Sequence, residues 1–310
     1  MWAYVIRRLI LAVPTVFGVT LIVFFLFGVV AEDPALTKAG PKATPEKVAE
    51  IARELGTDKS KLAQYADFLK QTVTLDFGDS WAKDRPVKEL LLEGLGPSMS
   101  VTLPAFFFAT IFAISLALFC AFYRDSVLDR ATIIASVAGM SISSLAYIIF
   151  GQFFVAYEWN LVPIFGHEVG FRGITFLLLP WAIWIVLTVG SEVRFFRTTM
   201  LEEMGQDYAR TAAAKGLGPR KILFKHILKN AMIPVITRVV ITIPFLFVGS
   251  LLLEKFFGIP GLGDLSVEAI FTDDFPVIKA ITIFGALLFI AFNLISDVLY
   301  ALVDPRVRLK

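Results

Sequence analysis

Six long apolar segments dominate the pattern of hydrophobic and polar positions along this chain. Each is almost free of charged residues, and each approaches or exceeds the about 20 helical residues that cross the hydrocarbon core of a bilayer. Their apolar positions are continuous rather than alternating, which excludes a transmembrane β-barrel. We therefore expect an all-α, polytopic membrane protein with six transmembrane helices, at residues 9–31, 98–122, 131–157, 174–190, 235–253 and 281–303.

The first apolar segment has two interpretations. Arg7 and Arg8 precede it, and the small residues Val29-Val30-Ala31 near its end are compatible with cleavage of a signal peptide. The apolar part of a signal peptide is usually only about 7–15 residues long, which is shorter than this segment. We therefore expect the segment to remain as the first transmembrane helix.

Lysine and arginine residues gather on one side of the six predicted helices. The positive-inside rule assigns that side to the cytoplasm, so both termini are predicted to be cytoplasmic. The short loops on the opposite side are mostly acidic. The residues that fix this orientation are Arg7, Arg8, Arg124, Arg130, Arg194, Arg197, Arg210, Lys215, Arg220, Lys221, Lys225, Lys229, Arg306, Arg308 and Lys310.

A polar region, 32–97, separates the first two predicted spans. Apolar stripes at helical spacing predict short helices over 45–54 and 60–72, and Thr44 before Pro45 is typical of a helix start. A small cap packed on the membrane domain is favoured over a docking surface for an outside partner. The chain thus divides into a first transmembrane helix at 1–31, an extracytoplasmic region at 32–97, and a core domain of five transmembrane helices at 98–310 with a cytoplasmic loop at about 194–234.

The composition agrees with a membrane protein and excludes several kinds of site. Of the 310 residues 57% are hydrophobic, and the net charge of only +2 gives no field for nucleic acid. A single cysteine, Cys120, and two distant histidines, His167 and His226, argue against a disulfide framework and a metal site. The chain has no Gly-Lys dipeptide and therefore no P-loop for ATP. We expect no catalytic residues, no metal and no cofactor.

A glycine-rich stretch, 257–263, lies between the last two predicted spans and reads FGIPGLG. It is only superficially similar to a nucleotide-binding fingerprint, because no strand precedes it and it is expected on the outer side. Three glycines and a proline within it favour turns over a helix. We expect an outer loop here.

Asn293 and Asp297 are the notable polar pair inside a predicted span, four residues apart on one helix face. Ionisable groups in a membrane are costly and often functional. One interpretation is interhelical hydrogen bonding, or an ion pair with Arg194, Arg197 or Arg238. The other is a group that lines the transport pathway. The structural interpretation is favoured.

The segment 207–229 is basic and partly amphipathic, and it lies between two apolar runs. Asp207–Ala214 is predicted to be helical, Gly216 and Gly218 break that helix, and Pro219 begins a second one that runs to about Asn230. Helices this short are not stable alone in water, so both must pack against something. Anionic lipid and a partner protein are the two candidates. The small residues 212–214 and the glycine turn favour close approach of a protein.

This segment closely resembles the cytoplasmic loop of ABC importer permeases, in particular the oligopeptide/dipeptide/nickel branch. The resemblance is carried by DYARTAAAKGL at 207–217 and by 226–234, and it extends over almost the whole chain. The chain is most similar to the first, B-type, of the two permeases in such systems. Further matches are Arg7-Arg8, LDFGDSW at 75–81, Arg85-Pro86-Val87, 128–130, FGIPGLG at 257–263 and the ending at 297–306.

Two positions depart from the general importer loop. That loop begins with Glu-Ala-Ala, where this chain has Arg210-Thr211-Ala212, and it ends in Leu-Pro, where this chain has Leu228-Lys229. Both departures suit the peptide branch. They narrow the resemblance to that branch.

The resemblance implies a type I ABC importer-like fold and a permease subunit in the bacterial cytoplasmic (inner) membrane. It implies a second homologous permease, two cytoplasmic ATPases that use ATP and magnesium, and an extracytoplasmic solute-binding protein as partners, besides membrane lipid. The solute is expected to be a di- or oligopeptide, with nickel or another small solute as the alternative. The chain itself would be no enzyme and would bind no nucleic acid. An ATPase-independent channel or secondary transporter is the alternative from another class.

The resemblance also implies roles for particular residues. Coupling to the ATPases is expected of Asp207, Arg210, Ala212, Ala213, Lys215, Gly216, Gly218, Pro219 and Lys225. The outer gate and the contact with the binding protein are expected of Glu254, Gly258, Pro260, Gly261, Gly263 and Asp264. Asn293 and Asp297 remain pathway or interhelical residues.

Overall fold

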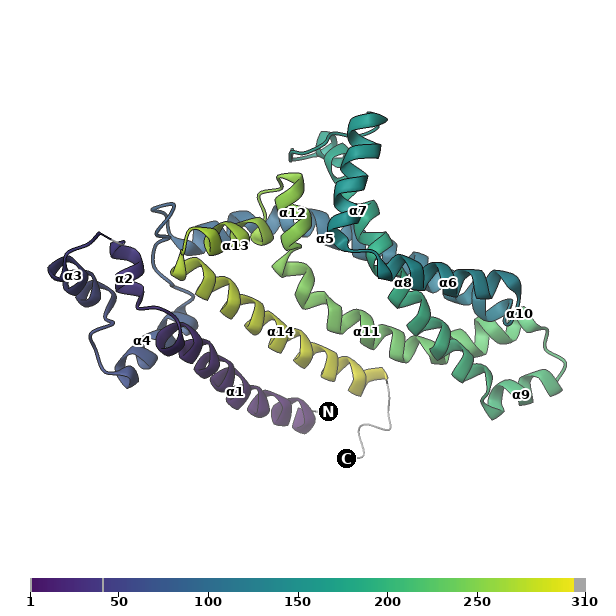
Figure 1. The fold of residues 1–310 in the computed structure, drawn as a ribbon. Helices are drawn as coiled ribbons and strands as arrows, with labels where there is room; N and C mark the ends of the chain where they lie inside the picture. The colour runs from purple at the N-terminus through teal and green to yellow at the C-terminus, as the bar shows by residue number, and fades with distance from the viewer. Residues whose placement is uncertain (1, 41, 304–310) are drawn as a thin grey trace. The chain divides into compact units, whose positions relative to one another are not determined.

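A computed structural model describes residues 2–40 and 42–303, and this part of the chain is built of helices without a named strand (Figure 1). The predicted all-α class is confirmed. The cationic residues Arg306, Arg308 and Lys310 lie outside the described residues. The α-helices are α1 (Trp2–Phe25), α2 (Pro34–Ala39), α3 (Pro45–Leu55), α4 (Lys61–Thr74), α5 (Val87–Phe122), α6 (Val127–Ser141), α7 (Ser144–Phe150), α8 (Ile174–Met204), α9 (Asp207–Ala214), α10 (Pro219–Ile222), α11 (Leu228–Val248), α12 (Leu251–Phe257), α13 (Leu262–Phe271) and α14 (Phe275–Val303).

Four short helical turns of other kinds join these helices. Three of them are π-helical and directly continue an α-helix, so they lengthen it rather than end it. The π-helical turns are η1 (Leu26–Val30) after α1, η2 (Gly151–Glu158) after α7, and η4 (Leu223–Ile227) between α10 and α11. The fourth turn, η3 (Phe171–Gly173), is a 3-10 turn before α8.

Among the described residues, five helices are long and apolar enough to cross a membrane, or six if one bent pair is a single span. The bent pair is Val127–Ser141 with Ser144–Glu158, which meet at 90°. The helix predicted over 131–157 is therefore not continuous, and it counts as one of six spans only if the bent pair is a single span. Ile142 and Ser143 adopt extended backbone angles at the break, and the Ser141 hydroxyl donates to Val137 O at 2.9 Å. Such back-bonding of serine bends helices.

Several helices extend beyond the apolar segments that predict them. α5 begins at Val87 instead of residue 98, and α8 continues to Met204 instead of residue 190. The added turns carry charged side chains that find partners on other helices, such as Glu192, whose Oε1 lies 3.1 Å from Arg238 Nη2. Hydrophobicity marks the part of a helix that suits lipid, so it does not mark the ends of the helix.

The contacts group the chain into two compact units, and each is described by itself. One unit comprises residues 1–98, 247–255 and 260–310, and the other comprises 99–246 and 256–259. The predicted division at residues 31 and 97 follows the order of the chain, whereas this grouping follows packing. In the first unit α1 lies along α14, so the first and the last helix of the described chain are neighbours (Figure 1).

The outer region 32–97 belongs entirely to the first unit. Thr44 Oγ1 accepts from Lys47 N at 3.4 Å and Pro45 takes the first helical position, which confirms the predicted start of α3. Phe68 and Phe77 of the outer region pack in one hydrophobic core with Leu262 and Val277. This packing agrees with the interpretation of the region as a small cap.

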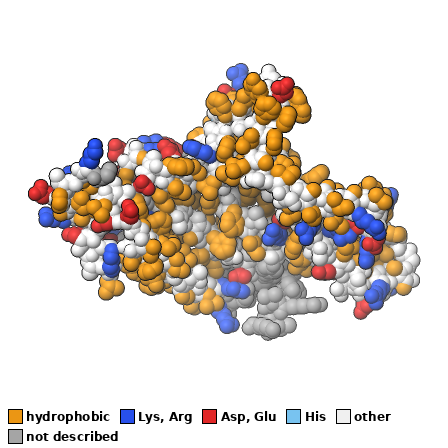
Figure 2. All heavy atoms as spheres, viewed as in Figure 1, with side chains coloured by type: hydrophobic (Ala, Val, Ile, Leu, Met, Phe, Trp, Pro, Cys, Tyr) orange, Lys and Arg blue, Asp and Glu red, His pale blue; other side chains and the backbone are white. Residues whose placement is uncertain are grey.

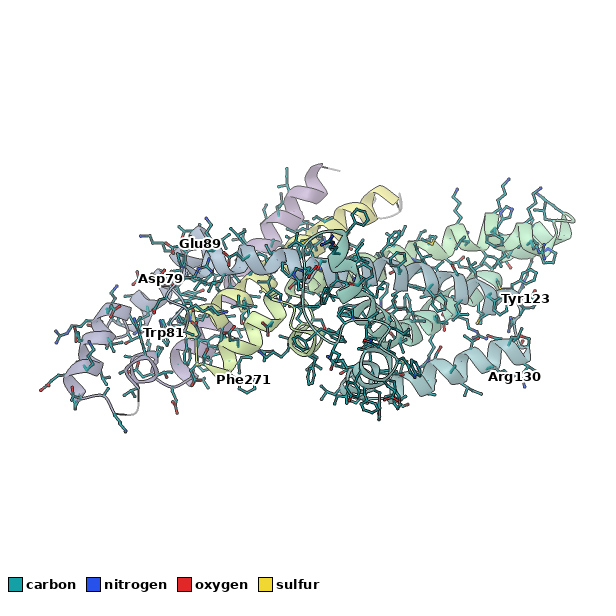
Figure 3. All side chains as sticks on the ribbon, turned by 90° about the horizontal axis from the view of Figure 1, so that it is seen from above. Asp79, Trp81, Glu89, Tyr123, Arg130 and Phe271 are labelled. Carbon is teal, nitrogen blue, oxygen red and sulfur yellow. The ribbon has the colours of Figure 1, made fainter. Side chains whose placement is uncertain are left out.

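A buried aspartate connects the outer region to the α13–α14 turn within the same unit. The Ser80 hydroxyl donates to Asp274, and the backbone N–H groups of Trp81 and Ala82 donate to the same carboxylate at 3.2 Å. Asp274 therefore holds the loop 75–81, which contains Gly78 at φ +76°. Figure 3 labels Trp81 on this loop.

Apolar side chains face outward along the membrane-spanning helices. On α1 the side chains of Ile10, Val13 and Ile22 are exposed, and hydrophobic side chains occupy much of the visible surface in Figure 2. In a soluble protein such a surface would favour aggregation, whereas on a membrane-spanning helix it is the surface that lipid covers.

In the second unit an ion pair joins the start of α6 to α8. Arg197 donates from Nε to Asp129 Oδ1 and from Nη2 to Asp129 Oδ2, both at 2.7 Å, and Asp125 N donates to the same carboxylate at 3.0 Å. The Asp129 side chain is only 1% exposed. This bidentate geometry fixes the α5–α6 turn, which Tyr123 and Arg130 flank (Figure 3).

Candidate functional site: a basic docking segment and a glycine-rich loop

The structure gives the segment 207–229 a helix–turn–helix form, which we call the docking segment. α9 ends where Gly216 takes φ +79°, and the N–H groups of Gly216 and Leu217 donate to Ala213 O and Ala212 O at 2.9 and 3.3 Å. Gly218 is extended, and Pro219 occupies the first position of α10. The predicted glycine turn and helix starts are confirmed.

The second helix of the docking segment does not end near Asn230 as predicted. α10, η4 and α11 form one helical run over Pro219–Val248. Ala231 and Val235, on either side of Pro234, are fully buried, so tertiary packing holds the helix together where the sequence suggests a break. The second helix of the docking segment is therefore the end of a membrane-spanning helix rather than part of a separate loop.

One face of the docking segment packs inward. Ala209, Leu223 and Ile227 are buried in one cluster with Phe196 and Met200 of α8. Ala212 is also buried, at 5% exposed, so it does not belong to the exposed small-residue surface that was expected. Ala213 and Ala214 do lie on the outside.

The Tyr208 hydroxyl fixes the entry of α9 by donating to Glu203 Oε2 at 2.5 Å. Burial of the ring, together with the neighbouring Glu203 carboxylate, raises the pKa of Tyr208. The tyrosine therefore stays neutral, and its hydroxyl remains a hydrogen-bond donor.

The opposite face is exposed and strongly basic. Figure 2 shows Lys and Arg side chains gathered over the end of the second unit that α9 and α10 form. The Asp207 carboxylate, at the start of α9, is exposed as well. The residues that share this exposed face are Arg210, Ala213, Lys215, Gly216, Gly218, Pro219, Arg220, Lys221 and Lys225.

Phe224 is a surface residue that sequence reasoning missed. Its side chain is 58% exposed, although it stands next to the buried Leu223. The only signal in the sequence is a large apolar residue outside the Leu223/Ile227 stripe of a basic helix. The π-helical turn there rotates the register, which makes the assignment of faces from a 3.6-residue period unreliable.

The glycine-rich loop, residues 249–264, contains a completely buried carboxylate. Glu254 is 0% exposed. Its Oε1 accepts from Ser250 N at 2.8 Å, and its Oε2 accepts from Gly263 N at 2.7 Å and from Asp264 N at 3.3 Å. The carboxylate thus occupies the anion site that the N-terminus of α13 creates. The anion that the backbone N–H groups of this loop bind is therefore the protein's own Glu254 carboxylate, and not a ligand.

Glycines allow the backbone to approach this carboxylate. A Cβ atom on Gly249 or Gly261 would collide with the Glu254 carboxylate, and one on Gly263 would lie 2.8 Å from its Oε2. Ser98 Oγ completes the arrangement by accepting from Leu262 N at 2.7 Å. The glycines are therefore required by contact with Glu254.

Burial raises the pKa of Glu254, and the N–H groups of Ser250, Gly263 and Asp264 oppose that effect.

The residues expected at the outer gate separate into buried and accessible ones. Glu254, Gly261 and Gly263 are buried and shape the loop, so the Glu254 side chain cannot reach a partner in this conformation.

The remaining residues of the expected outer gate are accessible. Gly258 and Pro260 are exposed. Asp264 is partly buried and pairs with Lys255 at 3.0 Å between Oδ1 and Nζ. Direct contact with a partner is thus open to Gly258 and Pro260.

The polar pair in α14 has local and interhelical partners. Asp297 Oδ2 lies 3.1 Å from Nη1 of Arg8 on α1, and Asn293 Nδ2 donates to Phe289 O of its own helix at 3.0 Å. Asp297 therefore forms an interhelical ion pair, as the favoured interpretation expected. Its partner is Arg8 and not Arg194, Arg197 or Arg238, and the last two pair with Asp129 and Glu192.

Comparison with known proteins covers nearly the whole chain. Residues 99–309 match the family described as binding-protein-dependent transport system inner membrane component, and residues 1–102 match the N-terminal domain of such components. The chain is 34% identical, over 99% of both lengths, to the glutathione transport system permease protein GsiC of Shigella flexneri serotype 5b (strain 8401). It is equally similar, at 34% over 99% of both lengths, to GsiC of Escherichia coli (strain K12) and to a putative peptide transport system permease protein of Brucella abortus (strain 2308).

Both family matches agree with the apolar helices and with the resemblance of the docking segment. Such components work with a binding protein and with ATPases, as the description of the family implies. The chain therefore belongs to the binding-protein-dependent transport system inner membrane components, the permease subunits of ABC importers, and resides in the bacterial inner membrane.

Proposed function

We propose that this permease translocates di- or oligopeptides, or a peptide-like solute, into the cell. The relatives that it matches over its full length are named for glutathione and peptide transport, which supports a peptide-like solute. Nickel or another small solute is the alternative within the same family. The binding protein would set most of the selectivity, since it delivers the solute to the permease.

The proposed assembly contains four further protein chains or domains. A second, homologous permease completes the pathway, two cytoplasmic ATPases bind ATP with magnesium, and an extracytoplasmic binding protein presents the solute. Both termini of this chain and the docking segment then lie in the cytoplasm, in agreement with the positive-inside pattern. The glycine-rich loop lies on the outer side.

The observation that carries the proposal is that the docking segment has one packed face and one exposed, basic face. Its inner face is packed against α8 through Ala209, Leu223 and Ile227, and its outer face is basic and exposed. A docking segment whose inner face is packed against another helix can transmit a displacement of its partner protein to that helix. Because the helical run Pro219–Val248 joins the segment to a membrane span, movement of an ATPase would reach the membrane through one helix.

The ATPases would change the conformational equilibrium only if they bind the docking segment differently in the inward- and outward-open states. The outer loop would respond as a unit, because Glu254 ties the start of α12 to the start of α13. Gly258 and Pro260 would then face the binding protein or the outer gate. Alternating access would couple these two ends of the permease.

A second role of the docking segment is favoured by the exposed Phe224 beside Lys225. A basic helix with an exposed aromatic side chain is also suited to a membrane surface that contains anionic lipid. Lipid contact and ATPase docking would then compete for the same face. Uptake and ATPase measurements on the complete transporter distinguish the two.

The test is Gly216→Val, with Gly218→Val as matched control, in the complete transporter reconstituted in proteoliposomes. Valine is strained at the φ of +79° that Gly216 adopts, whereas Gly218, at φ −66° and ψ 153°, accepts valine without strain. Both substitutions add the same bulk in open space.

We expect Gly216→Val to insert normally and to lose most of the peptide uptake per ATP hydrolysed. Gly218→Val adds the same bulk to the docking face without straining the backbone, so it should lose clearly less. Normal uptake and normal solute-stimulated ATPase activity in Gly216→Val would show that the turn has no coupling role.

A further inference from the structure

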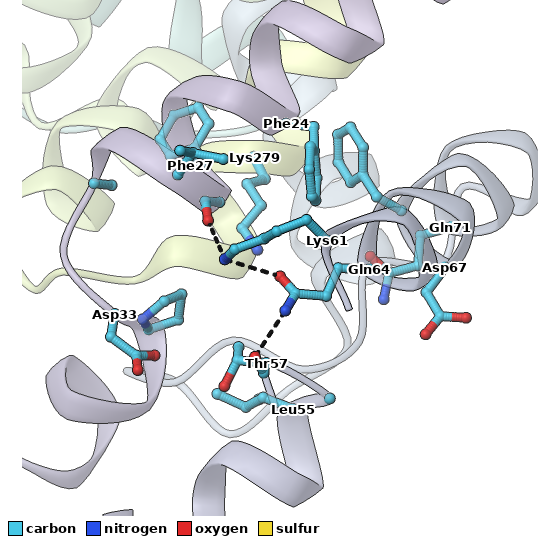
Figure 4. A pocket seen from close by; sticks show the side chains of 16 residues that line it. Phe24, Phe27, Asp33, Leu55, Thr57, Lys61, Gln64, Asp67, Gln71 and Lys279 are labelled. Atoms are coloured by element: carbon cyan, nitrogen blue, oxygen red, sulfur yellow. Dashed lines mark hydrogen bonds between the residues drawn. The ribbon is translucent and has the colours of Figure 1, made fainter. Parts of the chain in front are cut away.

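A polar pocket of about 270 Å³ lies in the first unit, where the end of α1 meets α2, α4 and α14 (Figure 4). Phe24 and Phe27 of the α1–η1 helix give it an apolar wall, and two lysines, Lys61 of α4 and Lys279 of α14, enter it from different helices. Neither the docking segment nor the glycine-rich loop contributes to this pocket. The transport function described above leaves it unexplained.

Lys61 is held in place by the protein. Its Nζ donates to Gly28 O at 2.7 Å and to Gln64 Oε1 at 3.4 Å. Gln64 is itself fixed, because its Nε2 donates to Thr57 O and Lys59 O, both at 2.7 Å. An ammonium group has three hydrogens, so Lys61 keeps one donor for a ligand.

Lys279 is the more unusual of the two. It lies in the second turn of the apolar helix α14, and within the described part of the chain no carboxylate forms an ion pair with it. An ionisable residue within a membrane-spanning helix is costly and marks a binding or transport site by default. All three donors of its ammonium group are available to a ligand in the pocket.

The two aspartates that line the same pocket already have partners. Asp67 Oδ2 lies 2.7 Å from Nζ of Lys59, and Asp33 Oδ1 accepts from Ala35 N at 2.9 Å at the start of α2. Figure 4 shows Asp67 projecting away from the two lysines. Within the described residues neither Lys61 nor Lys279 has a carboxylate as its ion-pair partner, and the natural counterpart of the two ammonium groups is an anion with several oxygen acceptors.

The position of the pocket along the helices identifies the kind of anion. The candidate span of α1 and η1 ends at Val30, and the candidate span of α14 begins at Phe275. The pocket thus lies at the boundary between hydrocarbon and water, where the phosphate groups of lipids reside. Val29 and Val30 are exposed beside it, on the surface that lipid covers.

We propose that this pocket binds the phosphate group of a membrane phospholipid. Lys61 and Lys279 donate to the phosphate oxygens, and Phe24 and Phe27 lie against the glycerol and the first carbons of the acyl chains. A bound lipid would thereby connect α1, α4 and α14, and so join the outer cap to the membrane helices. A soluble phosphate has the same chemistry without the apolar tail, so the experiment must separate the two sources.

The experiment measures ligand binding to the purified full-length chain in maltoside micelles, by native mass spectrometry and by thermal unfolding. The probes are phosphatidylglycerol, dioleoylglycerol as a lipid without phosphate, and inorganic phosphate. The variants are Lys279→Met and Lys61→Gln. The matched control is Lys70→Gln, because Lys70 lies on α4, is exposed and is not among the residues that line the pocket.

We expect phosphatidylglycerol to bind and to raise the unfolding temperature, and dioleoylglycerol to do neither. Each pocket variant should weaken phosphatidylglycerol binding by about tenfold or more, the effect of losing a charge-assisted hydrogen bond. Lys70→Gln should leave it unchanged. Because Lys61 is on the outer cap, Lys61→Gln tests the site even if Lys279→Met fails to fold.

Two results would overturn the proposal. Stabilisation by inorganic phosphate but not by phosphatidylglycerol would assign the pocket to a soluble anion and exclude lipid. Equal loss of phosphatidylglycerol binding in Lys70→Gln and in the pocket variants would show non-specific attraction to positive charge.

Discussion

Replacing Glu254 by alanine should loosen the glycine-rich loop far more than a surface glutamate replacement would. The substitution removes the acceptor of three backbone N–H groups, those of Ser250, Gly263 and Asp264. A buried donor left without an acceptor costs about 1–3 kcal/mol, and the bond to Asp264, at 3.3 Å, is the weakest of the three. We therefore expect the loop to lose about 3–5 kcal/mol of local stability.

Hydrogen exchange followed by mass spectrometry measures this loss directly. Because about 1.4 kcal/mol corresponds to a factor of ten, peptides that contain residues 250 and 263–264 should exchange about a hundredfold to a few thousandfold faster in Glu254→Ala. Glu254→Gln keeps the shape but turns an amide NH2 toward backbone donors, so it should show a smaller increase. Exchange in α11 should change little.

Glu268→Gln provides the matched control, since Glu268 lies on α13 and makes only a partly exposed ion pair with Lys83. Such pairs contribute about 0–1 kcal/mol, so exchange near residue 263 should stay unchanged. If Glu254→Ala exchanged no faster than Glu268→Gln, the buried carboxylate would not hold the loop together, and its role in the outer gate would have to be abandoned.

Three further predictions follow from the ion pairs and from the docking surface. Arg197→Ala should destabilise the protein by about 3–5 kcal/mol in chemical unfolding, because it leaves the Asp129 carboxylate buried and unpaired, and Asp129→Asn in the same chain should recover part of the loss. Arg8→Gln should change the unfolding free energy by less than about 1 kcal/mol, because the pair with Asp297 is partly exposed; a larger loss would mean that the pair is shielded from water. Phe224→Ser should reduce co-purification of the ATPase by about tenfold without changing the unfolding temperature, since an exposed aromatic side chain is typical of an interface hot spot; unchanged co-purification would leave lipid as its partner.

The sequence was sufficient to predict most of the helices and the turn of the docking segment. Continuous hydrophobicity identified the spans because lipid demands it along the whole helix. Gly216 and Pro219 identified the turn because each has a conformational preference that acts locally. The predicted extent of α9 and the predicted start of α3 after Thr44 rest on the same kind of local rule.

The features that could not be predicted depend on contacts between distant residues. The bend near Ile142–Ser143 contains no glycine or proline, and the back-bonding of Ser141 that accompanies it is only a weak local signal. Glu254 was expected to contact a partner at the outer gate, because only the fold brings Gly263 and Asp264 to its carboxylate. The pairing of Asp297 with Arg8 likewise joins the two ends of the chain.

The central claim is that the docking segment binds the ATPase and transmits its movement. Single cysteines at Ala213 and Lys221, both exposed, test it by cross-linking to the ATPase subunit in the assembled transporter. The natural Cys120 is fully buried and gives no background, and Leu62→Cys, exposed on the outer cap, is the control. We predict cross-links from residues 213 and 221 that change in yield when ATP binds, and none from residue 62. Absence of cross-links from both docking positions, in a transporter that still imports its solute, would contradict the account.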